Sequence, residues 1–182
     1  YRLQRRGGRG VAALTTREED FVENLFITST HDTIMFFTNA GRVHSLKAYE
    51  IPEGGRQSKG MAIVNLLNLA GDEKINAVIP ISEYEPDSNL VFVTKNGITK
   101  RTKFEHFKNI RKTGLIAIGL RDDDELISVR KTYGEEELII VTAKGMAIRF
   151  KEEDVRQMGR TAMGVKGINL NKKDEVVGMD LV

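Results

Sequence analysis

One 18-residue pattern occurs three times in the chain, and no other feature of the sequence restricts the fold as strongly. The three copies are IMFFTNAGRVHSLKAYEI at 34–51, LVFVTKNGITKRTKFEHF at 90–107 and LIIVTAKGMAIRFKEEDV at 138–155. Each copy runs from four apolar residues through a threonine and two further residues to a glycine: Gly41, Gly97 and Gly145. A β-branched and aromatic run before a glycine is typical of a β-hairpin, because glycine adopts positive φ without steric cost.

A second pattern follows each hairpin. GMAIVNL begins at Gly60, GLIAIGL at Gly114 and GVKGINL at Gly164, and a leucine stands six residues after each of these glycines. An acidic cluster and another apolar run come next in each case. The repeating unit is therefore roughly 50 residues of several short strands, present about three and a half times.

Repeats of this length with no amphipathic helix predict an all-β, propeller-like fold of four-stranded blades. A single blade cannot bury both faces of its sheet, so we expect blades to stack around an axis. A β-sandwich is the alternative, and the fidelity of the repeated hairpin argues against it. We predict that residues 1–182 form a single domain or part of one. Its predicted parts are an opening loop with a closing strand at 1–23 and repeats at about 24–81, 82–131 and 132–182.

The composition is that of an ordinary globular chain. The net charge is only +2, so the distribution of charge has to indicate the partner rather than its sum. Cysteine is absent, which excludes disulfides and thiolate metal sites. No apolar run has the length of about 18 residues that a membrane span needs. Because the chain begins at Tyr1, we expect it to be a piece of a longer protein.

The opening stretch QRRGGRG, residues 4–10, is the most basic loop of the chain. Setting Gly8 against Gly60, Gly114 and Gly164 aligns the basic loops of successive repeats. Equivalent positions of a radial array lie at the same height and radius, so these loops predict a basic rim that binds a phosphate backbone. Outside the opening stretch, the predicted rim residues are Lys47, Arg56, Lys59, Lys100, Arg101, Lys103, Arg111, Lys112, Lys151, Arg160 and Lys166.

Several motifs can be set aside. GRGVAA at 8–13 fits a loose dinucleotide pattern but follows no strand, and GRQSKG at 55–60 lacks the Lys-Ser/Thr that ends a phosphate loop. A disordered RGG segment is an alternative for the opening stretch, although it aligns with the other loops. The three histidines, His31, His44 and His106, have no metal-ligand spacing. We interpret the carboxylate runs as exposed loops and predict no catalytic residue and no metal ligand.

QRRGGRG resembles the GyrA box, Q-R-R-G-G-K-G, of the C-terminal domain of the bacterial DNA gyrase A subunit, with Arg9 in place of lysine. The hairpins TNAGR, TKNGI and TAKGM are similar to the blade repeats of that domain. The related topoisomerase IV protein shares the blades but generally lacks an intact box. The resemblance implies a β-pinwheel, a propeller-like disc whose blades exchange strands with their neighbours.

The resemblance also implies a function. It suggests a non-catalytic domain that wraps duplex DNA, so that strand passage by the enzyme introduces negative supercoils. The implied box residues are Gln4, Arg5, Arg6, Gly7, Gly8, Arg9 and Gly10. The implied partners are double-stranded DNA, the rest of the gyrase A subunit and the gyrase B subunit, in the bacterial cytoplasm at the nucleoid. No cofactor is expected in the domain itself, whereas the holoenzyme uses ATP and Mg²⁺. The alternatives are a propeller-type protein-interaction module, a propeller enzyme and the equivalent domain of topoisomerase IV.

Overall fold

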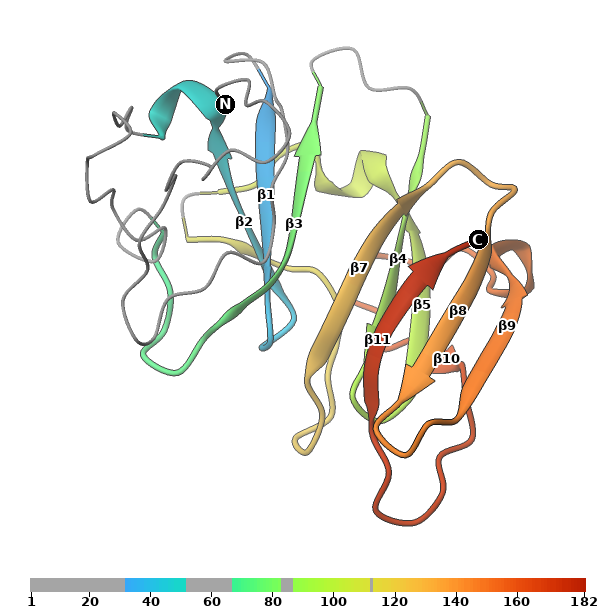
Figure 1. Ribbon diagram of the computed structural model, residues 1–182. Coiled ribbons are helices and arrows are strands. Elements are labelled where there is room, and N and C mark those ends of the chain that lie inside the picture. The colour runs from blue at the N-terminus through green and yellow to red at the C-terminus, as the bar shows by residue number, and fades with distance from the viewer. Residues whose placement is uncertain (1–31, 52–66, 83–86, 112) are drawn as a thin grey trace, which may run out of the picture.

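The computed structural model describes residues 32–51, 67–82, 87–111 and 113–182 (Figure 1). The predicted opening loop at 1–23 lies outside these residues. The described strands are β1 (Thr33–Thr38), β2 (Arg42–Lys47), β3 (Ile75–Ile81), β4 (Asn89–Thr94), β5 (Ile98–Lys103), β6 (Leu115–Ile116), β7 (Leu126–Thr132), β8 (Glu137–Thr142), β9 (Ala147–Lys151), β10 (Val165–Lys166) and β11 (Val176–Leu181). The described helices are the short 3₁₀ segments η1 (Ala48–Glu50), η3 (Phe104–Phe107) and η4 (Glu152–Asp154). None of them is long and apolar enough to cross a membrane.

The three predicted hairpins form as β1–β2, β4–β5 and β8–β9. Their turn glycines, Gly41, Gly97 and Gly145, have φ of 76°, 85° and 83°, which confirms the need for positive φ at this position. The threonine before each turn has a role of its own. The Thr94 hydroxyl accepts a hydrogen bond of 3.1 Å from the Ile98 amide, and Thr142 does the same for the Met146 amide. Threonine therefore closes the turn in addition to favouring a strand.

A 3₁₀ helix follows each hairpin and explains the apolar residue ten positions after the turn glycine. Phe107 is 2% exposed and Val155 is 3% exposed, so this turn of helix returns an apolar side chain to the core. The lysine six positions after the glycine ends the second strand of each hairpin and stands directly before the helix. These lysines are Lys47, Lys103 and Lys151.

Strands are exchanged between neighbouring repeats. The first sheet has the order β3-β1-β2-β6 and the second has the order β10-β5-β4-β7. β6 belongs to the second repeat and β10 to the third, so each repeat adds an edge strand to the sheet before it. The third sheet, β11-β8-β9, has three described strands. The all-β, propeller-like prediction is confirmed, with four-stranded sheets where the following repeat is described.

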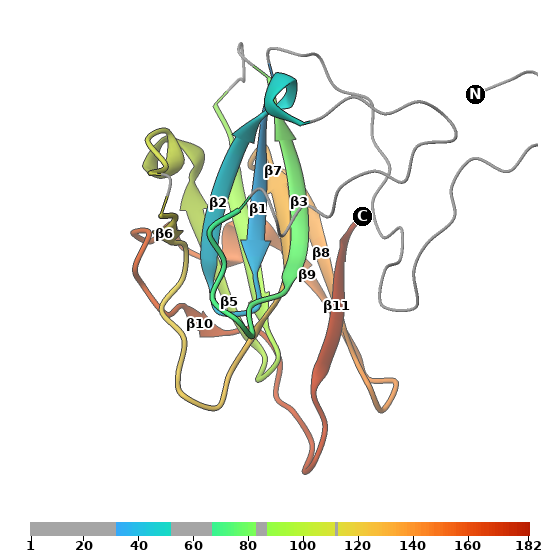
Figure 2. The ribbon, with the colours of Figure 1, turned by 90° about the vertical axis from the view of Figure 1, so that its left-hand side faces the viewer.

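The sheets stand side by side like blades around an axis. β7 lies next to both β3 and β11, so the three sheets come together along this inner edge. Figure 2 looks onto the first sheet, with β6, β10 and η3 on the side away from β3 and β11. We call the edge that carries β6 and β10 the outer edge.

Alternate residues of β4 explain how neighbouring sheets adhere, since every residue of this strand is buried. Leu90 and Phe92 face the first sheet, and the Phe92 ring lies 5.7 Å from that of Phe37 in an edge-to-face arrangement. Val91 and Val93 face the third sheet and pack in a second cluster with its residues. Each such side chain contributes about 1.5–3 kcal/mol on burial, so both faces of the second sheet hold the stack together.

Candidate nucleic-acid interface

The described basic loops lie at the outer edge, where each connects a 3₁₀ helix to an exchanged strand. Residues 108–111 and 113–119 belong to the second-repeat loop, which runs from the end of η3 past β6. Residues 155–164 form the third-repeat loop, between η4 and β10. Gly114 and Gly164, with φ of 82° and 103°, turn the chain into β6 and β10. The marker glycines of the sequence are thus the points at which the chain crosses to the preceding sheet.

Apart from Lys100 and Arg101, the predicted rim residues fall into three groups. Exposed side chains are those of Lys47, Arg111, Lys151 and Lys166. Lys103 and Arg160 are partly exposed. Residues outside the described part of the chain are Gln4 to Gly10, Arg56, Lys59 and Lys112.

Lys100 is the clearest correction to the predicted rim, because its side chain is fully buried. Its Nζ donates to the carbonyl oxygens of Ala117 and Arg160, each at 2.5 Å, and lies 4.9 Å from the centre of the Phe92 ring. Burial, and secondarily the charge of Arg160, lowers the pKa of Lys100 to about 7. The exchanged strand and the next loop cover this side chain, so the prediction that Lys100 lies on the rim is wrong.

Arg101, also predicted as a rim residue, is not a free cation either. Its side chain is 12% exposed, its Nε donates to the Val155 carbonyl at 2.7 Å, and Nη1 lies 3.7 Å from the Glu152 carboxylate. Glu152 is fully buried at the junction of the second and third sheets. Burial raises the pKa of Glu152, and the adjacent Glu136 carboxylate raises it further, against the opposing effects of Thr132 and Arg101. Arg101 therefore joins two repeats instead of facing solvent.

The two basic loops contact each other at the outer edge. The Arg160 guanidinium donates to the Ile116 carbonyl at 2.5 Å, and the Gly119 amide donates to the Ala162 carbonyl at 3.1 Å. A β-carbon on Gly119 would stand 2.7 Å from the Thr161 carbonyl oxygen. The third-repeat loop therefore lies directly on the second-repeat loop at the surface of the outer edge.

Two exposed cations of this surface fall outside the predicted set. Lys108 and Arg156 both follow the buried apolar residue at the end of the 3₁₀ helix, and both are exposed. Their shared position, eleven residues after Gly97 and Gly145, could have been found by extending the repeat alignment by one residue.

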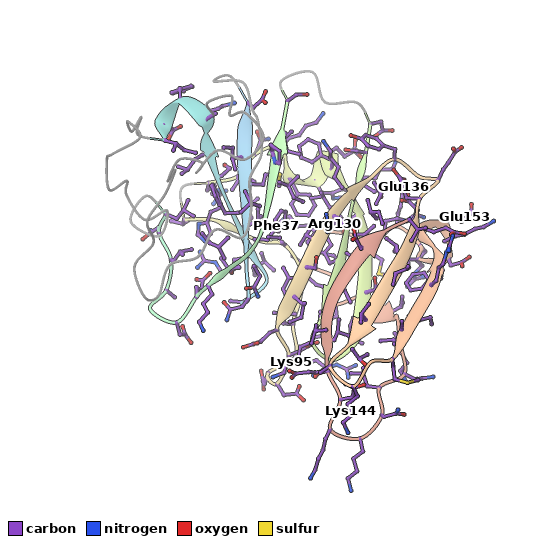
Figure 3. All side chains as sticks on the ribbon, in the orientation of Figure 1. Phe37, Lys95, Arg130, Glu136, Lys144 and Glu153 are labelled. Atoms are coloured by element: carbon purple, nitrogen blue, oxygen red, sulfur yellow. The ribbon has the colours of Figure 1, made fainter. Side chains whose placement is uncertain are left out.

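Carboxylates gather instead at the hairpin turns, at the ends of the sheets. The Asp124 side chain accepts a hydrogen bond of 2.9 Å from the Asn96 amide, and Asp174 accepts one of 3.0 Å from the Lys144 amide. Asp124 is only 9% exposed, so the interpretation of these runs as exposed loops is wrong for it. Burial would raise the pKa of Asp174, but hydrogen bonds from the Thr142 hydroxyl and nearby amides outweigh burial and lower it. Figure 3 shows Lys95 and Lys144 at this end of the sheets and Glu136 and Glu153 at the other.

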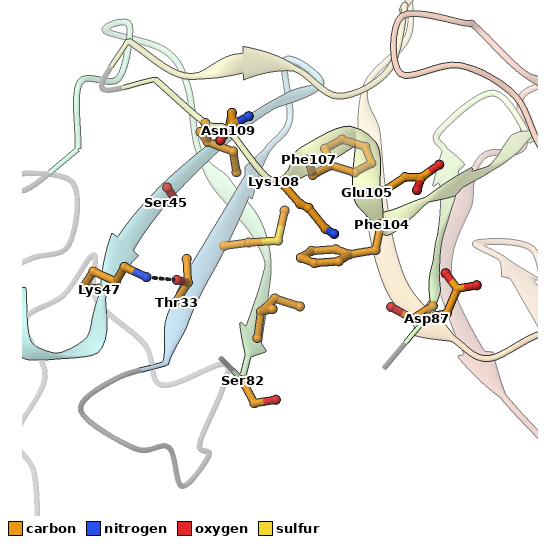
Figure 4. A pocket seen from close by; sticks show the side chains of 14 residues that line it. Thr33, Ser45, Lys47, Ser82, Asp87, Phe104, Glu105, Phe107, Lys108 and Asn109 are labelled. Carbon is orange, nitrogen blue, oxygen red and sulfur yellow. Dashed lines mark hydrogen bonds between the residues drawn. The ribbon is translucent and has the colours of Figure 1, made fainter. Parts of the chain in front are cut away.

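A cleft of about 720 Å³ lies between the first and second sheets (Figure 4). Lys108 and Phe104 reach into it, and Thr33 and Lys47 pair on its other wall at 2.9 Å. The described residues that line it include no histidine. Within the described ranges, no group of three His, Asp or Glu side chains is placed to hold a metal ion.

With this geometry in view, comparison with known proteins identifies the family. The family described as "DNA gyrase C-terminal domain, beta-propeller" matches residues 1–29, 32–82, 88–132 and 136–182. The chain belongs to this family. It is 62% identical over 167 residues, 92% of its length, to the DNA gyrase A subunit of Clostridium acetobutylicum. It is 52% identical over its whole length to the DNA gyrase A subunit of Staphylococcus aureus. In both cases the chain spans 20% of the relative's length.

Solved structures agree with this assignment to the gyrase family. The C-terminal domain of DNA topoisomerase IV superposes with a TM-score of 0.84 at 33% identity, over 93% of the chain and 53% of that domain. A DNA gyrase A C-terminal domain superposes with a TM-score of 0.73 at 30% identity, over 98% of the chain and 57% of that domain. Both enzymes share the blade architecture, whereas the curated relatives above, at 52% and 62% identity, are gyrase subunits.

Proposed function

We propose that the chain binds duplex DNA along its outer edge and bends it, as the wrapping domain of a gyrase A subunit. The observation that supports this most strongly is the direct contact between the second-repeat and third-repeat loops. Exposed cations stand on the surface of these two touching loops and of the adjoining strand β10: Lys108, Arg111, Arg156 and Lys166. A duplex that follows this surface neutralises phosphates in succession, and the affinity comes from released counterions.

The fan of the sheets explains why binding would also bend the duplex. The sheets converge at β3, β7 and β11, so successive loops at the outer edge point in different directions. Smooth bending of a 20–30 bp site costs about 1–6 kcal/mol, and several phosphate contacts are needed to offset it. Side chains that contact phosphates do not distinguish bases, so sequence preference should be weak.

Within the enzyme, this domain would position the DNA and would not catalyse a reaction. In this proposal the box residues Gln4–Gly10 clamp one end of the wrapped duplex, and the wrap presents a second segment to the cleavage core with one handedness. DNA cleavage resides in the rest of the A subunit, and ATP is hydrolysed by the B subunit with Mg²⁺. The domain itself requires no cofactor.

The test is a topological footprint on circular DNA. Nicked circles are sealed by ligase in the presence of the chain, the protein is removed, and the topoisomers are separated on a gel. Wrapping with one hand shifts the linking-number distribution in proportion to the protein bound. A protein-interaction module leaves the distribution unchanged, and this result would reject the proposal.

A matched pair of variants assigns the effect to the outer edge. The double variant Lys108→Glu, Arg156→Glu reverses two outer-edge charges. The double variant Lys95→Glu, Lys144→Glu makes the same change in net charge near the hairpin turns that carry Lys95 and Lys144. We call this end of the sheets the turn end. The shift should disappear in the first variant and persist in the second. Equal loss in both would show that total charge, rather than the outer edge, governs binding.

A further inference from the structure

The third residue after each hairpin glycine occupies the same place in all three sheets but meets three different surroundings. It is His44 in the first sheet, Lys100 in the second and Ile148 in the third. His44 and Lys100 are buried, and each meets the loop of the following repeat: His44 packs on Gly114, and Lys100 donates to the Gly159 and Arg160 carbonyls. Ile148 is 37% exposed on β9, an edge strand among the described residues. This position therefore lies where one repeat is joined to the next.

Lys100 joins three segments at this position. Its Nζ reaches from β5 to Ala117 of the second-repeat loop at 2.5 Å, and to Arg160 and Gly159 of the third-repeat loop at 2.5 and 3.3 Å. All three acceptors are backbone carbonyl oxygens. In its protonated form the Lys100 side chain has three donors and no acceptor, so these three carbonyls match its full hydrogen-bonding capacity.

Arg101 holds the same loop from the other side of β5. Its Nε donates to the Val155 carbonyl at 2.7 Å, and its own carbonyl accepts from the Met158 amide at 2.8 Å. Two consecutive residues of one strand thus fix the third-repeat loop at its beginning and at its middle. The exposed cation Arg156 lies between these anchors, and its backbone is set before any ligand arrives.

A buried lysine is an expensive way to fill this space. Removing an ammonium group from water is strongly unfavourable unless it is hydrogen-bonded, and an apolar side chain of similar volume avoids this cost. What the lysine provides and an apolar residue lacks is direction, because its hydrogen bonds specify where the Ala117 and Arg160 backbones lie relative to each other. These two segments carry the cations that a bent duplex would contact in succession.

We propose that Lys100 is a positioning residue for DNA bending: it sets the spacing between the second-repeat and third-repeat loops and thereby the curvature of the bound duplex, without touching DNA. The inference rests on the proposed function. A residue that contacts DNA would change both the bend of the duplex and the number of phosphate contacts. A positioning residue changes the bend, whereas the number of phosphate contacts stays the same.

The test compares the variant Lys100→Met with the unaltered chain on a duplex labelled at both ends for fluorescence transfer. At equal saturation, Lys100→Met should lose most of the increase in transfer that bound DNA shows. The slope of log affinity against log salt should change by less than about one phosphate equivalent. Lys144→Met, the same substitution at an exposed site near the hairpin turns and away from the outer edge, should leave the bend intact. A bend in Lys100→Met equal to that of the unaltered chain would overturn the proposal.

A second variant covers the case in which Lys100→Met does not fold. Gly119→Ala leaves Lys100 in place but directs a methyl group at the Thr161 carbonyl, 2.7 Å away, and so displaces the same loop. It should also reduce the bend. A folded Gly119→Ala chain that bends DNA normally would reject the proposal independently.

A measurement without DNA distinguishes this proposal from the proposed function. The chain has no cysteine, so Thr113→Cys and Thr161→Cys, both at exposed positions, can carry one spin label on each loop. The distance distribution should be narrow with Lys100 present and broader or displaced in Lys100→Met. An unchanged distribution would refute the positioning role. If the unaltered chain fails to bend DNA, the proposed function fails whatever this distribution shows.

Discussion

The Cε1 atom of His44 lies 2.7 Å from the point where a β-carbon on Gly114 would stand, and Nδ1 lies 2.9 Å from it. The buried imidazole of the first sheet thus packs on the backbone of the second-repeat loop, where the chain turns with φ of 82° toward β6. This contact joins the first and second repeats, as Lys100 joins the second and third. It requires glycine at position 114 for two separate reasons, conformation and space.

Gly114→Ala should therefore lower the free energy of unfolding by about 2–4 kcal/mol, from backbone strain and from displacement of His44. Gly145→Ala is the matched control, because its φ is 83° but nothing lies within 4 Å of the added carbon. The control should lose only the strain component, about 1 kcal/mol. Urea denaturation of both variants gives the comparison. Equal losses of stability in the two variants would mean that the His44 side chain moves away from the added methyl group at no cost in free energy.

Asp124→Ala should destabilise the second sheet by about 1–3 kcal/mol, because the Asn96 amide and the neighbouring Glu125 amide lose a charged acceptor. Asp122→Ala, an exposed change in the same acidic run, should cost less than about 0.5 kcal/mol. Thermal melting distinguishes the two. If both variants lose the same stability, the hydrogen bonds that Asp124 accepts contribute nothing, and this acidic run behaves as a solvated loop.

The stability of the chain should rise with pH above neutrality because of Lys100. The pKa of Lys100 is about 7 in the folded chain, against 10.5 for a lysine side chain in water. Between these values the unfolded chain binds more protons, so the free energy of unfolding increases as the pH rises. Urea denaturation at about pH 7 and about pH 9.5 measures this slope. Lys100→Met should abolish it and Lys103→Met should keep it, whereas a slope that survives Lys100→Met would assign it to another group.

Salt dependence should identify the cations that contact phosphate. Lys108→Ala and Arg156→Ala should each reduce the slope of log affinity against log salt by about 0.9. Lys95→Ala, a change of the same charge at the turn end, should leave the slope unaltered. Fluorescence anisotropy with a duplex at several salt concentrations provides the slopes. No difference among the three variants would contradict the placement of DNA at the outer edge.

The opening stretch should contribute to wrapping more than to affinity. The triple variant Arg5→Ala, Arg6→Ala, Arg9→Ala removes the clamp at one end, and DNA bound along the outer edge need no longer stay bent. In gyrase reassembled from both of its subunits, negative supercoiling should be lost while ATP-dependent relaxation and DNA cleavage persist. Supercoiling at the normal rate would reduce QRRGGRG to an ordinary surface loop.

The hairpins and their turns could be predicted from the sequence because they depend on short-range physics. Thr94 and Gly97 close one turn between neighbouring residues, and the pattern of four apolar residues before them requires a buried strand. Repetition of that pattern implies stacked sheets, since one such sheet leaves apolar faces uncovered. The opening stretch is predicted to bind DNA from its charge, its alignment with the other basic loops and its resemblance to a seven-residue box, and it lies outside the described residues.

The exposure of the basic residues could not be predicted in this way. His44, Lys100 and Ile148 hold one position in the repeat, yet the lysine there is buried and serves as a donor to three backbone carbonyls. Its surroundings come from residues 117 and 159–160, which are 17 to 60 positions away along the chain. Strand exchange between repeats brings these residues to Lys100. The sequence of one repeat does not indicate which residues of the next repeat will bury this position. A local pattern determines what each repeat can form, whereas contacts between repeats determine which of its charged side chains stay exposed to solvent.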